Sequence, residues 1–270
     1  MSPLNLSVTS REYKLMLNPD RFQDRHQGSQ VFFSLIDFLI KKEGGKITER
    51  QDKEERRQTS YLDTPELALH QNGFALRLRE EAKTEDGFQI NLKYRGADRY
   101  ISAGQDLSGS EAGKSKFEED IMPPFISKFS HSNSINTSKR PDLESIAAVT
   151  SIFPGLKSLD IAGDTVVKTA NDFKALEVVR KLCKFQFGEP PTIKASLSFW
   201  YLTDENEWPL VREFSFDYDE LDDGSGGSRL ETYPSRVVEG TNRFFRALQS
   251  QAGWLDLSRT TKTAFALEVL

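Results

Sequence analysis

Residues 59–81 read Thr-Ser-Tyr-Leu-Asp-Thr-Pro-Glu-Leu-Ala-Leu-His-Gln-Asn-Gly-Phe-Ala-Leu-Arg-Leu-Arg-Glu-Glu, and this stretch tells more about the fold than any other. It predicts a short strand at residues 61–63, followed by a short helix. Thr64 is a suitable N-cap for that helix, and Pro65 suits its first turn. The pair Asn72-Gly73 is typical of a helix end, so the chain is expected to turn there.

A second strand is predicted directly after this turn, because apolar and basic residues alternate strictly. Leu76 and Leu78 share one face, and Arg77 and Arg79 share the other. Two arginines side by side on one strand face repel each other unless an anion lies opposite them. The alternation therefore raises the question of which anion these arginines meet.

The composition argues against several partners. The chain has 270 residues and a net charge of −5, which disfavours nucleic-acid binding through a generally basic surface. No apolar run approaches the roughly 18 residues of a membrane helix, and the first residues lack the basic and apolar regions of a secretion signal. We therefore expect no nucleic acid and no membrane as partner. The lone Cys183 suits a reducing compartment, so a cytoplasmic location is expected.

The residue types also restrict the metal. One cysteine and three scattered histidines, His26, His70 and His131, make a zinc site unfavourable. Carboxylates are plentiful and prefer hard cations. Any metal cofactor is therefore expected to be Mg²⁺ or Mn²⁺.

Periodicity along the chain predicts a strand-rich fold with a few helices. Helices are predicted at residues 29–42, 142–152 and 235–251. Strands are predicted at 8–17, 46–62 (as a strand pair or one bent strand), 74–80, 88–95, 115–121, 176–187, 193–203 and 209–219. The charge run at 52–57 is interpreted as a solvated turn and the Gly- and Ser-rich stretch 102–114 as a loop. Residues 131–141 are the expected hinge between two halves of the chain.

Several predicted strands pair an apolar face with an ionic one. The ionic positions are Glu12 and Lys14; Arg77 and Arg79; Lys93 and Arg95; Lys116, Glu118 and Asp120; Arg180 and Lys184; Glu213 and Asp217. A solvated sheet face or internal salt bridges would explain each strand taken alone. An inward-facing set would instead suit a linear triphosphate, because Arg and Lys match phosphate oxygens, and a divalent cation would bridge the phosphates to the carboxylates. Both interpretations stay open on the residues alone.

The order of motifs resembles the CYTH superfamily, the triphosphate tunnel metalloenzymes. The resemblance rests on Tyr61-Leu62-Asp63-Thr64-Pro65, the Leu76–Arg79 strand and four further segments. These segments are Glu12-Tyr13-Lys14, Leu92-Lys93-Tyr94-Arg95, Lys116-Phe117-Glu118-Glu119-Asp120 and the tail around Lys262. They span nearly the whole chain, with a weak match at about 125–175.

The resemblance implies an α+β fold in which a closed, eight-stranded antiparallel β barrel forms a tunnel, with helices packed outside. Residues 1–270 would make one such domain. Glu12 would be a catalytic metal ligand, and Lys14 a catalytic phosphate contact or an aid to positioning metal-bound water. The implied substrate-binding residues are Arg77, Arg79, Lys93, Arg95, Lys116, Arg180, Lys184 and Lys262. The implied metal ligands are Glu12, Glu118, Glu213 and Asp217, with Glu231 a weaker candidate.

One position departs from the family pattern. Many members begin Glu-x-Glu-x-Lys, whereas this chain has Ser10 at the first of these positions and Glu12 at the second. A serine hydroxyl is a poor substitute for a carboxylate ligand of Mg²⁺. The departure bears directly on whether one of two metal positions is retained.

The function expected first is metal-dependent hydrolysis of inorganic triphosphate or a related triphosphate. The second is a non-catalytic module that binds polyphosphate or nucleotides. An adenylate cyclase and a thiamine triphosphatase are further activities of the same superfamily. The sequence identifies no base-binding pocket, and it leaves the oligomeric state open.

Overall fold

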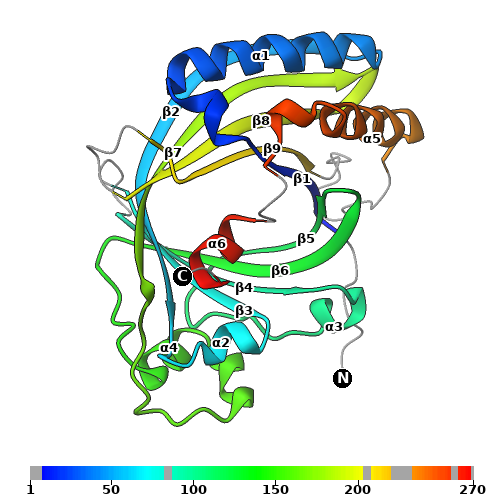
Figure 1. Cartoon of the computed structure of the whole chain (residues 1–270). Coiled ribbons are helices and arrows are strands. Elements are labelled where there is room, and N and C mark those ends of the chain that lie inside the picture. Colours follow the sequence, from blue (N-terminus) through cyan, green and yellow to red (C-terminus); the bar gives the residue numbers. More distant parts are fainter. Residues whose placement is uncertain (1–7, 82–86, 203–207, 220–232, 257–260, 269–270) are drawn as a thin grey trace.

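The computed structural model describes residues 8–81, 87–202, 208–219, 233–256 and 261–268. In this part of the chain nine strands form a closed barrel (Figure 1). The strands are β1 (Ser10–Met16), β2 (Lys46–Asp63), β3 (Phe74–Glu80), β4 (Phe88–Gly96), β5 (Lys114–Met122), β6 (Ile126–Thr137), β7 (Lys168–Phe187), β8 (Glu189–Tyr201) and β9 (Val211–Asp219).

The order around the barrel is β1-β5-β6-β4-β3-β2-β7-β8-β9. β1 closes the ring by pairing with β5 on one side and β9 on the other. The β1–β5 pair is parallel, and the other pairs within the described residues are antiparallel. The expected eight-stranded, fully antiparallel barrel is therefore wrong in its strand count and in the direction of one pair.

The additional strand is β6, part of which lies in the segment expected to be a hinge. Residues 126–137 pair with β4 and β5 and complete the sheet between them. The Ser-rich sequence gives a linker-like composition, but Ser130 and Ser132 are buried. The Ser130 hydroxyl donates a 2.5 Å hydrogen bond to Asp120. Small hydroxyl side chains fit the polar interior of this barrel, where they can donate hydrogen bonds to buried carboxylates.

The charge run at residues 52–57 is also part of a strand. These residues lie inside β2, which is one continuous strand paired with β7 through register shifts. Cross-strand ion pairs such as Lys181–Glu55, at 2.6 Å, match opposite charges on the two strands. The solvated-turn interpretation was wrong because opposite charges on neighbouring strands can stabilise a ladder as well as a turn.

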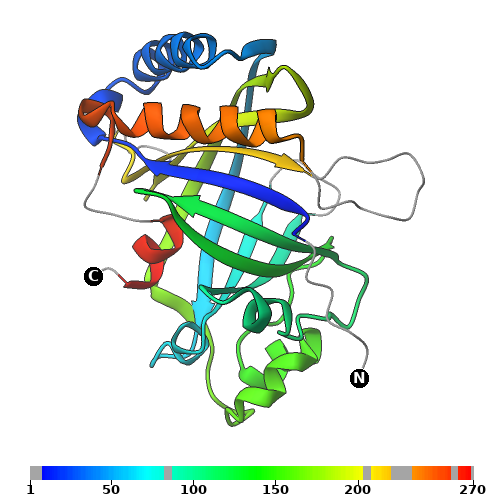
Figure 2. The ribbon, with the colours of Figure 1, turned by 90° about the vertical axis from the view of Figure 1, so that its right-hand side faces the viewer.

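Two long helices cover one side of the barrel (Figures 1 and 2). They are α1 (Arg25–Lys42), capped by Asp24, and α5 (Ser235–Gln249). The largest hydrophobic core lies between these helices and the outer faces of β1, β7, β8 and β9. Phe32 of α1 and Phe244 of α5 each pack against aromatic residues of the sheet. This core fixes the barrel wall, so the inner faces of the same strands are held in place.

The opposite side of the barrel carries shorter helices. They are α2 (Ala68–Gln71), α3 (Arg99–Ala103) and α4 (Ile146–Ile152). A second core packs α2 and α4 against the outward side chains Leu76 and Leu78. The leucine face of β3 thus points away from the barrel interior, and the arginine face points into it.

A last short helix, α6 (Lys262–Glu268), lies at one opening of the barrel in both ribbon views (Figures 1 and 2). A small third core joins its Ala266 and Leu267 to Tyr61, Trp200 and Val211 of the barrel strands. Helix α6, the last described element, therefore contributes side chains to the barrel interior.

The turn after β2 is built differently from the predicted helix start. The Asp63 carboxylate accepts backbone hydrogen bonds from Thr64, Leu69 and His70, at 2.7 to 2.8 Å. The Thr64 hydroxyl accepts one from the Ala68 amide. α2 begins at Ala68 rather than at Pro65, because the chain first makes a turn in which Leu67 takes a left-handed conformation, with φ 57°.

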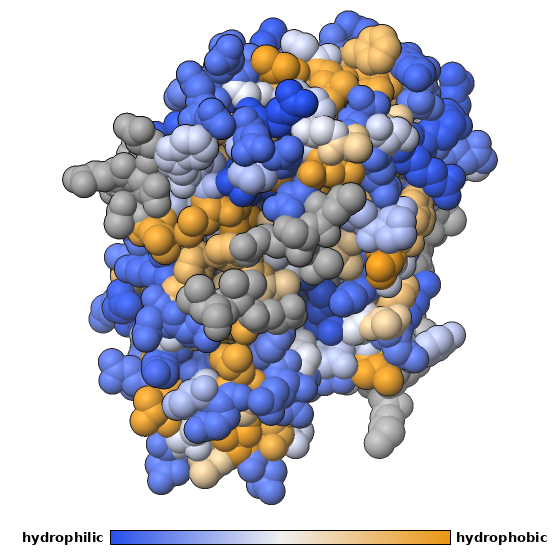
Figure 3. All heavy atoms as spheres, in the orientation of Figure 1, coloured by the Kyte–Doolittle hydropathy of each residue, from blue (hydrophilic) through white to orange (hydrophobic). Residues whose placement is uncertain are grey.

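Figure 3 shows apolar atoms left of the middle of this face, close to where α6 lies in Figure 1, and further apolar patches near its upper and lower ends, with polar atoms between them. Among the helices that the structure describes, none combines the length and the apolar character needed to cross a bilayer.

Candidate functional site

The barrel interior contains a polar cavity of about 230 Å³, here named the central cavity. Its walls are inner faces of β1, β2, β3, β4 and β9, together with the start of α6. Six cationic side chains line it: Lys14, Arg77, Arg79, Lys93, Arg95 and Lys262. Two acidic side chains, Glu12 and Glu213, line it as well. The cavity wall therefore carries a clear excess of positive charge.

A buried carboxylate, Glu177 of β7, holds one group of these cations. Its Oε2 atom accepts hydrogen bonds from Arg57 at 2.7 Å and from Arg79 at 2.9 Å. Its Oε1 atom accepts from Lys262 at 3.1 Å and from the Trp200 indole at 3.1 Å. Burial alone would raise the pKa of Glu177, but the surrounding cations outweigh it and hold the pKa well below its usual range. One negative charge is thus shared among three positive side chains.

Arg77, in contrast to Arg79, forms no hydrogen bond to a carboxylate within the described residues. No hydrogen bond or ion pair of its guanidinium is found within the described residues, and its buried Nε atom lacks an acceptor. Its neighbour on the same strand face is Arg79. Burial and the Arg77 charge lower the pKa of Arg79 to about 9, against the opposing effect of Glu177. Two cations lie side by side here and one of them has no ion pair within the described residues, so this part of the wall suits an anion.

A second cluster holds the other cations through Asp120, which is fully buried. Asp120 forms ion pairs of 2.8 Å with Lys14 and with Arg95. Lys14 also pairs with Glu12 at 2.9 Å. Burial favours the neutral amine, but Asp120 and Glu12 outweigh it and raise the pKa of Lys14. Lys14 is therefore a fixed positive charge at neutral pH.

Glu118, on the same strand as Asp120, is engaged in a similar way. It pairs with Lys93 at 3.1 Å and with Lys116 at 3.4 Å. The Ser10 hydroxyl donates a 2.9 Å hydrogen bond to its Oε1 atom. These contacts hold Lys93, whose side chain lines the central cavity.

The structure brings together most, but not all, of the residues implied by the resemblance. Lys116 reaches Glu118 without belonging to the cavity lining. Arg180 and Lys184 do not line the cavity either: they pair with Asp52 and Glu49 across the β2–β7 ribbon. Register shifts within β7 break the simple alternation on which their shared face was based, so Arg180 and Lys184 lie outside the lining of the central cavity.

The expected metal ligands are distributed unevenly. Glu12 and Glu213 line the cavity, whereas Glu118 is buried behind it. Asp217 lies opposite Glu12 on the neighbouring strand β9, and Glu231 lies outside the described residues. Among the residues that the structure describes, no group of three or more acidic, histidine or cysteine side chains is arranged to hold a metal ion. The expected set of four carboxylates is therefore not gathered at one point.

A smaller metal site remains chemically compatible with the cavity. Mg²⁺ commonly binds through one or two carboxylates and completes its coordination with substrate phosphates and water. Glu12 and Glu213 supply two such carboxylates on the inner face of the barrel. Their donor type fits Mg²⁺ or Mn²⁺ that is bound together with a triphosphate.

The sequence did not single out Glu177 and Arg57 as site residues. Glu177 sits within Ala-Leu-Glu-Val-Val, and a lone acid in an apolar strand was the available signal for a buried ion pair. Arg57 was assigned to the supposed surface turn at residues 52–57. Its position opposite Glu177 follows from β2–β7 pairing, which is not readable from local pattern.

Neither a protein-family model nor a curated protein sequence matches the chain. Similar solved structures include a candidate adenylyl cyclase from Hippeastrum, described as having a dominant triphosphatase activity. That structure has 11% sequence identity, a TM-score of 0.49 and 97% coverage of both chains. A candidate adenylate cyclase from Bacillus halodurans has 12% identity, a TM-score of 0.42 and coverage of 96% of this chain and 97% of its own. One from Vibrio parahaemolyticus has 15% identity, a TM-score of 0.33 and coverage of 88% and 89%.

Proposed function

We propose that this protein hydrolyses the terminal phosphate of inorganic triphosphate or a related triphosphate compound, bound in the central cavity, with Mg²⁺ or Mn²⁺. The observation that carries the proposal is the charge of the cavity wall. Six cationic side chains face two acidic ones, and Arg77 is unpaired within the described residues. A linear triphosphate supplies several negative charges in a row, which such a wall can match.

The main role of the buried acids is to hold the cationic side chains in place. Glu177 and Asp120 lie behind the wall and fix the directions of Arg79, Lys262, Arg95 and Lys14. A preorganised cationic wall stabilises the negative charge of a phosphoryl-transfer transition state without rearranging during the reaction. Lys14 contributes charge and position, since its raised pKa makes it a poor proton acceptor.

Glu12 and Glu213 are the side chains that would hold the metal. When bound, the metal would polarise the phosphoryl group and help offset the charge that develops on it. Glu213 also pairs with Lys262 at 3.1 Å, so this carboxylate is held at the cavity surface even without the ion.

A phosphate-release assay tests the proposal. The wild-type protein should release phosphate from a triphosphate with Mg²⁺ or Mn²⁺, and EDTA should stop the reaction. Glu12→Gln removes the charge that a hard cation requires, so turnover should fall at least a hundredfold while calorimetry still detects triphosphate binding. Glu49→Gln, at an exposed carboxylate outside the cavity, is the matched control and should keep wild-type turnover. Wild-type turnover in Glu12→Gln would show that Glu12 is not a metal ligand.

A non-catalytic module that binds polyphosphate or nucleotides is the second candidate. The engagement of Glu118 favours it: two lysines and Ser10 already satisfy this carboxylate, which leaves fewer acids for a metal. Tight triphosphate binding without phosphate release under any tested metal would select this candidate.

A further inference from the structure

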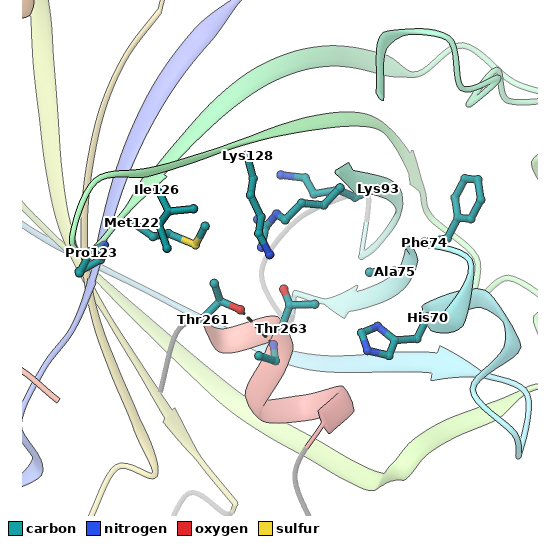
Figure 4. Close-up of a pocket in the computed structure, with 13 residues that line it drawn as sticks. His70, Phe74, Ala75, Lys93, Met122, Pro123, Ile126, Lys128, Thr261 and Thr263 are labelled. Atoms are coloured by element: carbon teal, nitrogen blue, oxygen red, sulfur yellow. Dashed lines mark hydrogen bonds between the residues drawn. The ribbon is translucent and has the colours of Figure 1, made fainter. Parts of the chain in front are cut away.

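The last short helix, α6, is held at the barrel by contacts at both of its ends. Its start faces the central cavity, because Thr261, Lys262 and Thr263 line that space. The Thr261 hydroxyl accepts a hydrogen bond from the Ala264 amide at 3.0 Å and so caps the start of the helix (Figure 4). The start of α6 is thus capped from within its own segment, whereas the end of α6 meets a side chain from another strand.

The side chain at the end of α6 is Asn171 of β7. Its amide donates hydrogen bonds to the backbone carbonyl groups of Ala266 and Leu267, at 3.1 and 3.4 Å. The last carbonyl groups of a helix have no donor within the helix, so a side-chain donor at this point satisfies them. Further along β7, the Phe173 ring packs edge-to-face against Phe265 of α6, with 5.3 Å between the ring centroids. β7 therefore holds the end of α6 with one polar and one aromatic contact.

The backbone of β7 departs from a regular strand where it makes these contacts. Four residues of β7, at positions 170–173, lie opposite the single β2 residue Tyr61. A common bulge places only two residues opposite one. Asn171 and Asp172 have φ angles of 53° and 51°, in the left-handed region that Asn and Asp adopt more readily than most residues. Such a backbone persists where the surrounding structure holds it, and the contacts with α6 are made from this bulge.

The place of Lys262 depends on α6, since Lys262 is the first residue of this helix. Its ammonium group donates hydrogen bonds to Glu177 at 3.1 Å and to Ser198 at 3.0 Å, and it pairs with Glu213 at 3.1 Å. These partners belong to three strands, β7, β8 and β9. With seven residues, α6 is too short to be stable without contacts to the barrel. A shift of the helix would therefore disturb all three contacts of the ammonium group together.

We infer that Asn171 is a positioning residue for the central cavity: it holds the end of α6, and α6 holds Lys262 against the barrel wall. Asn171 lies outside the described lining of the cavity, so it acts through the helix rather than on a ligand. The inference rests on the proposed function, in which Lys262 is one of the cationic side chains that meet the phosphates. A positive charge contributes most when it is fixed in place before the ligand binds.

Asn171→Gly is the main variant, because glycine keeps the left-handed backbone and removes the amide. It should weaken triphosphate binding in calorimetry about fivefold or more and lower kcat/KM by a similar factor. Asn171→Asp also tolerates this backbone, but its carboxylate would face carbonyl groups of α6, so its losses should be larger. Asp172→Gly, at the adjacent left-handed position with an exposed side chain, is the matched control and should keep wild-type values. Wild-type binding in Asn171→Gly, or smaller losses in Asn171→Asp, would overturn the inference.

A double-mutant comparison separates positioning from a general effect on stability. In the Lys262→Met background, Asn171→Gly should change triphosphate binding less than about twofold, because the charge that Asn171 positions is absent. Equal losses in the two backgrounds would show that Asn171 acts by another route, and the inference would fail. Hydrogen exchange gives a second readout. The α6 amides should exchange faster in Asn171→Gly while those of β3 and β4 keep their wild-type rates, and faster exchange in all three elements would contradict a local role.

The two proposals fail in different ways. If no metal supports phosphate release, the hydrolase function fails, and calorimetric binding of triphosphate to the same variants still decides the role of Asn171. If phosphate is released and Asn171→Gly binds and hydrolyses triphosphate as the wild type does, the inference fails while the hydrolase function stands. If the wild type does not bind triphosphate at all, both proposals fail.

Discussion

Ser10 and Glu118 lie directly opposite each other on the parallel strands β1 and β5, and the Ser10 hydroxyl donates a 2.9 Å hydrogen bond to the Glu118 carboxylate. Both side chains are buried, with exposed fractions of 1% and 8%. The position at which the family pattern has a glutamate thus points at another carboxylate. In this chain a neutral donor occupies it instead.

Ser10→Glu is expected to destabilise the protein when no divalent cation is present. A second buried carboxylate beside Glu118 lacks a partner, because Lys93 and Lys116 are already engaged. The free energy of unfolding should fall by about 1–3 kcal/mol, and millimolar Mg²⁺ should restore part of it. Urea unfolding with and without Mg²⁺ measures both effects. Ser10→Ala is the control, with a loss of about 1 kcal/mol and no response to metal; unchanged stability of Ser10→Glu without metal would refute this.

Arg77→Ala and Arg79→Ala should differ although they change neighbouring residues of one strand face. Arg77 has no ion pair within the described residues, so its removal should weaken triphosphate binding by about 1.5–3 kcal/mol without lowering stability. Arg79→Ala should weaken binding and also lower stability, because Glu177 loses a partner. Calorimetric titration and urea unfolding on both variants check this. Identical stability losses would contradict the different pairing of the two arginines.

Glu177→Gln should destabilise the protein strongly and make it depend on anions. The substitution removes the single negative charge shared by Arg57, Arg79 and Lys262. Leaving buried charges without their partner costs about 3–5 kcal/mol. Triphosphate should raise the melting temperature of Glu177→Gln more than that of the wild type, since a bound anion replaces the missing charge. Equal shifts in the two proteins would show that Glu177 does not balance the cations of the ligand site.

Acid should unfold the protein partly through Glu118. Burial alone would raise the pKa of Glu118, but Lys93 and Lys116 outweigh it and lower the pKa from 4.5 to about 2. A carboxylate with a depressed folded-state pKa stabilises the fold above its unfolded-state value and loses that effect as pH falls. Its contribution should therefore be complete above pH 4.5 and should disappear towards pH 2. The urea midpoint of Glu118→Gln should vary less with pH across this window than that of the wild type, and an equal slope would speak against the assignment.

Local pattern was sufficient for some parts of the fold and insufficient for others. β3 occupies residues 74–80 as predicted, because strict alternation of Leu and Arg fixes both the strand and its two faces. β6 was missed because its inner face uses serines, whose composition is also typical of linkers. The alternation within β3 is enough to predict that strand. β6 instead forms a strand because it pairs with β4 and β5 and because its Ser130 hydroxyl donates a hydrogen bond to Asp120.

Local pattern likewise predicted some residues of the central cavity and misplaced others. Arg77, Arg79, Lys93 and Arg95 belong to strands with clear alternation, and all four line the central cavity. Arg180 and Lys184 follow a similar spacing, but register shifts between β7 and its partners change which side chains face inward. Bulges of this kind depend on partner strands far away in the sequence, so local spacing does not reveal them.

The placement of β1 has a consequence for how the chain folds. Its partners are residues 118–121 on one side and residues 213–219 on the other, so its hydrogen bonds join distant parts of the chain. Contacts of such long range slow folding, since a large loop must close before they form. During synthesis the pairing of β1 with β9 cannot form until β9 has left the ribosome. We expect β1 amides to gain protection later than those of the β3–β4 hairpin in pulse-labelled hydrogen exchange during refolding, because β3 and β4 are neighbours in the sequence.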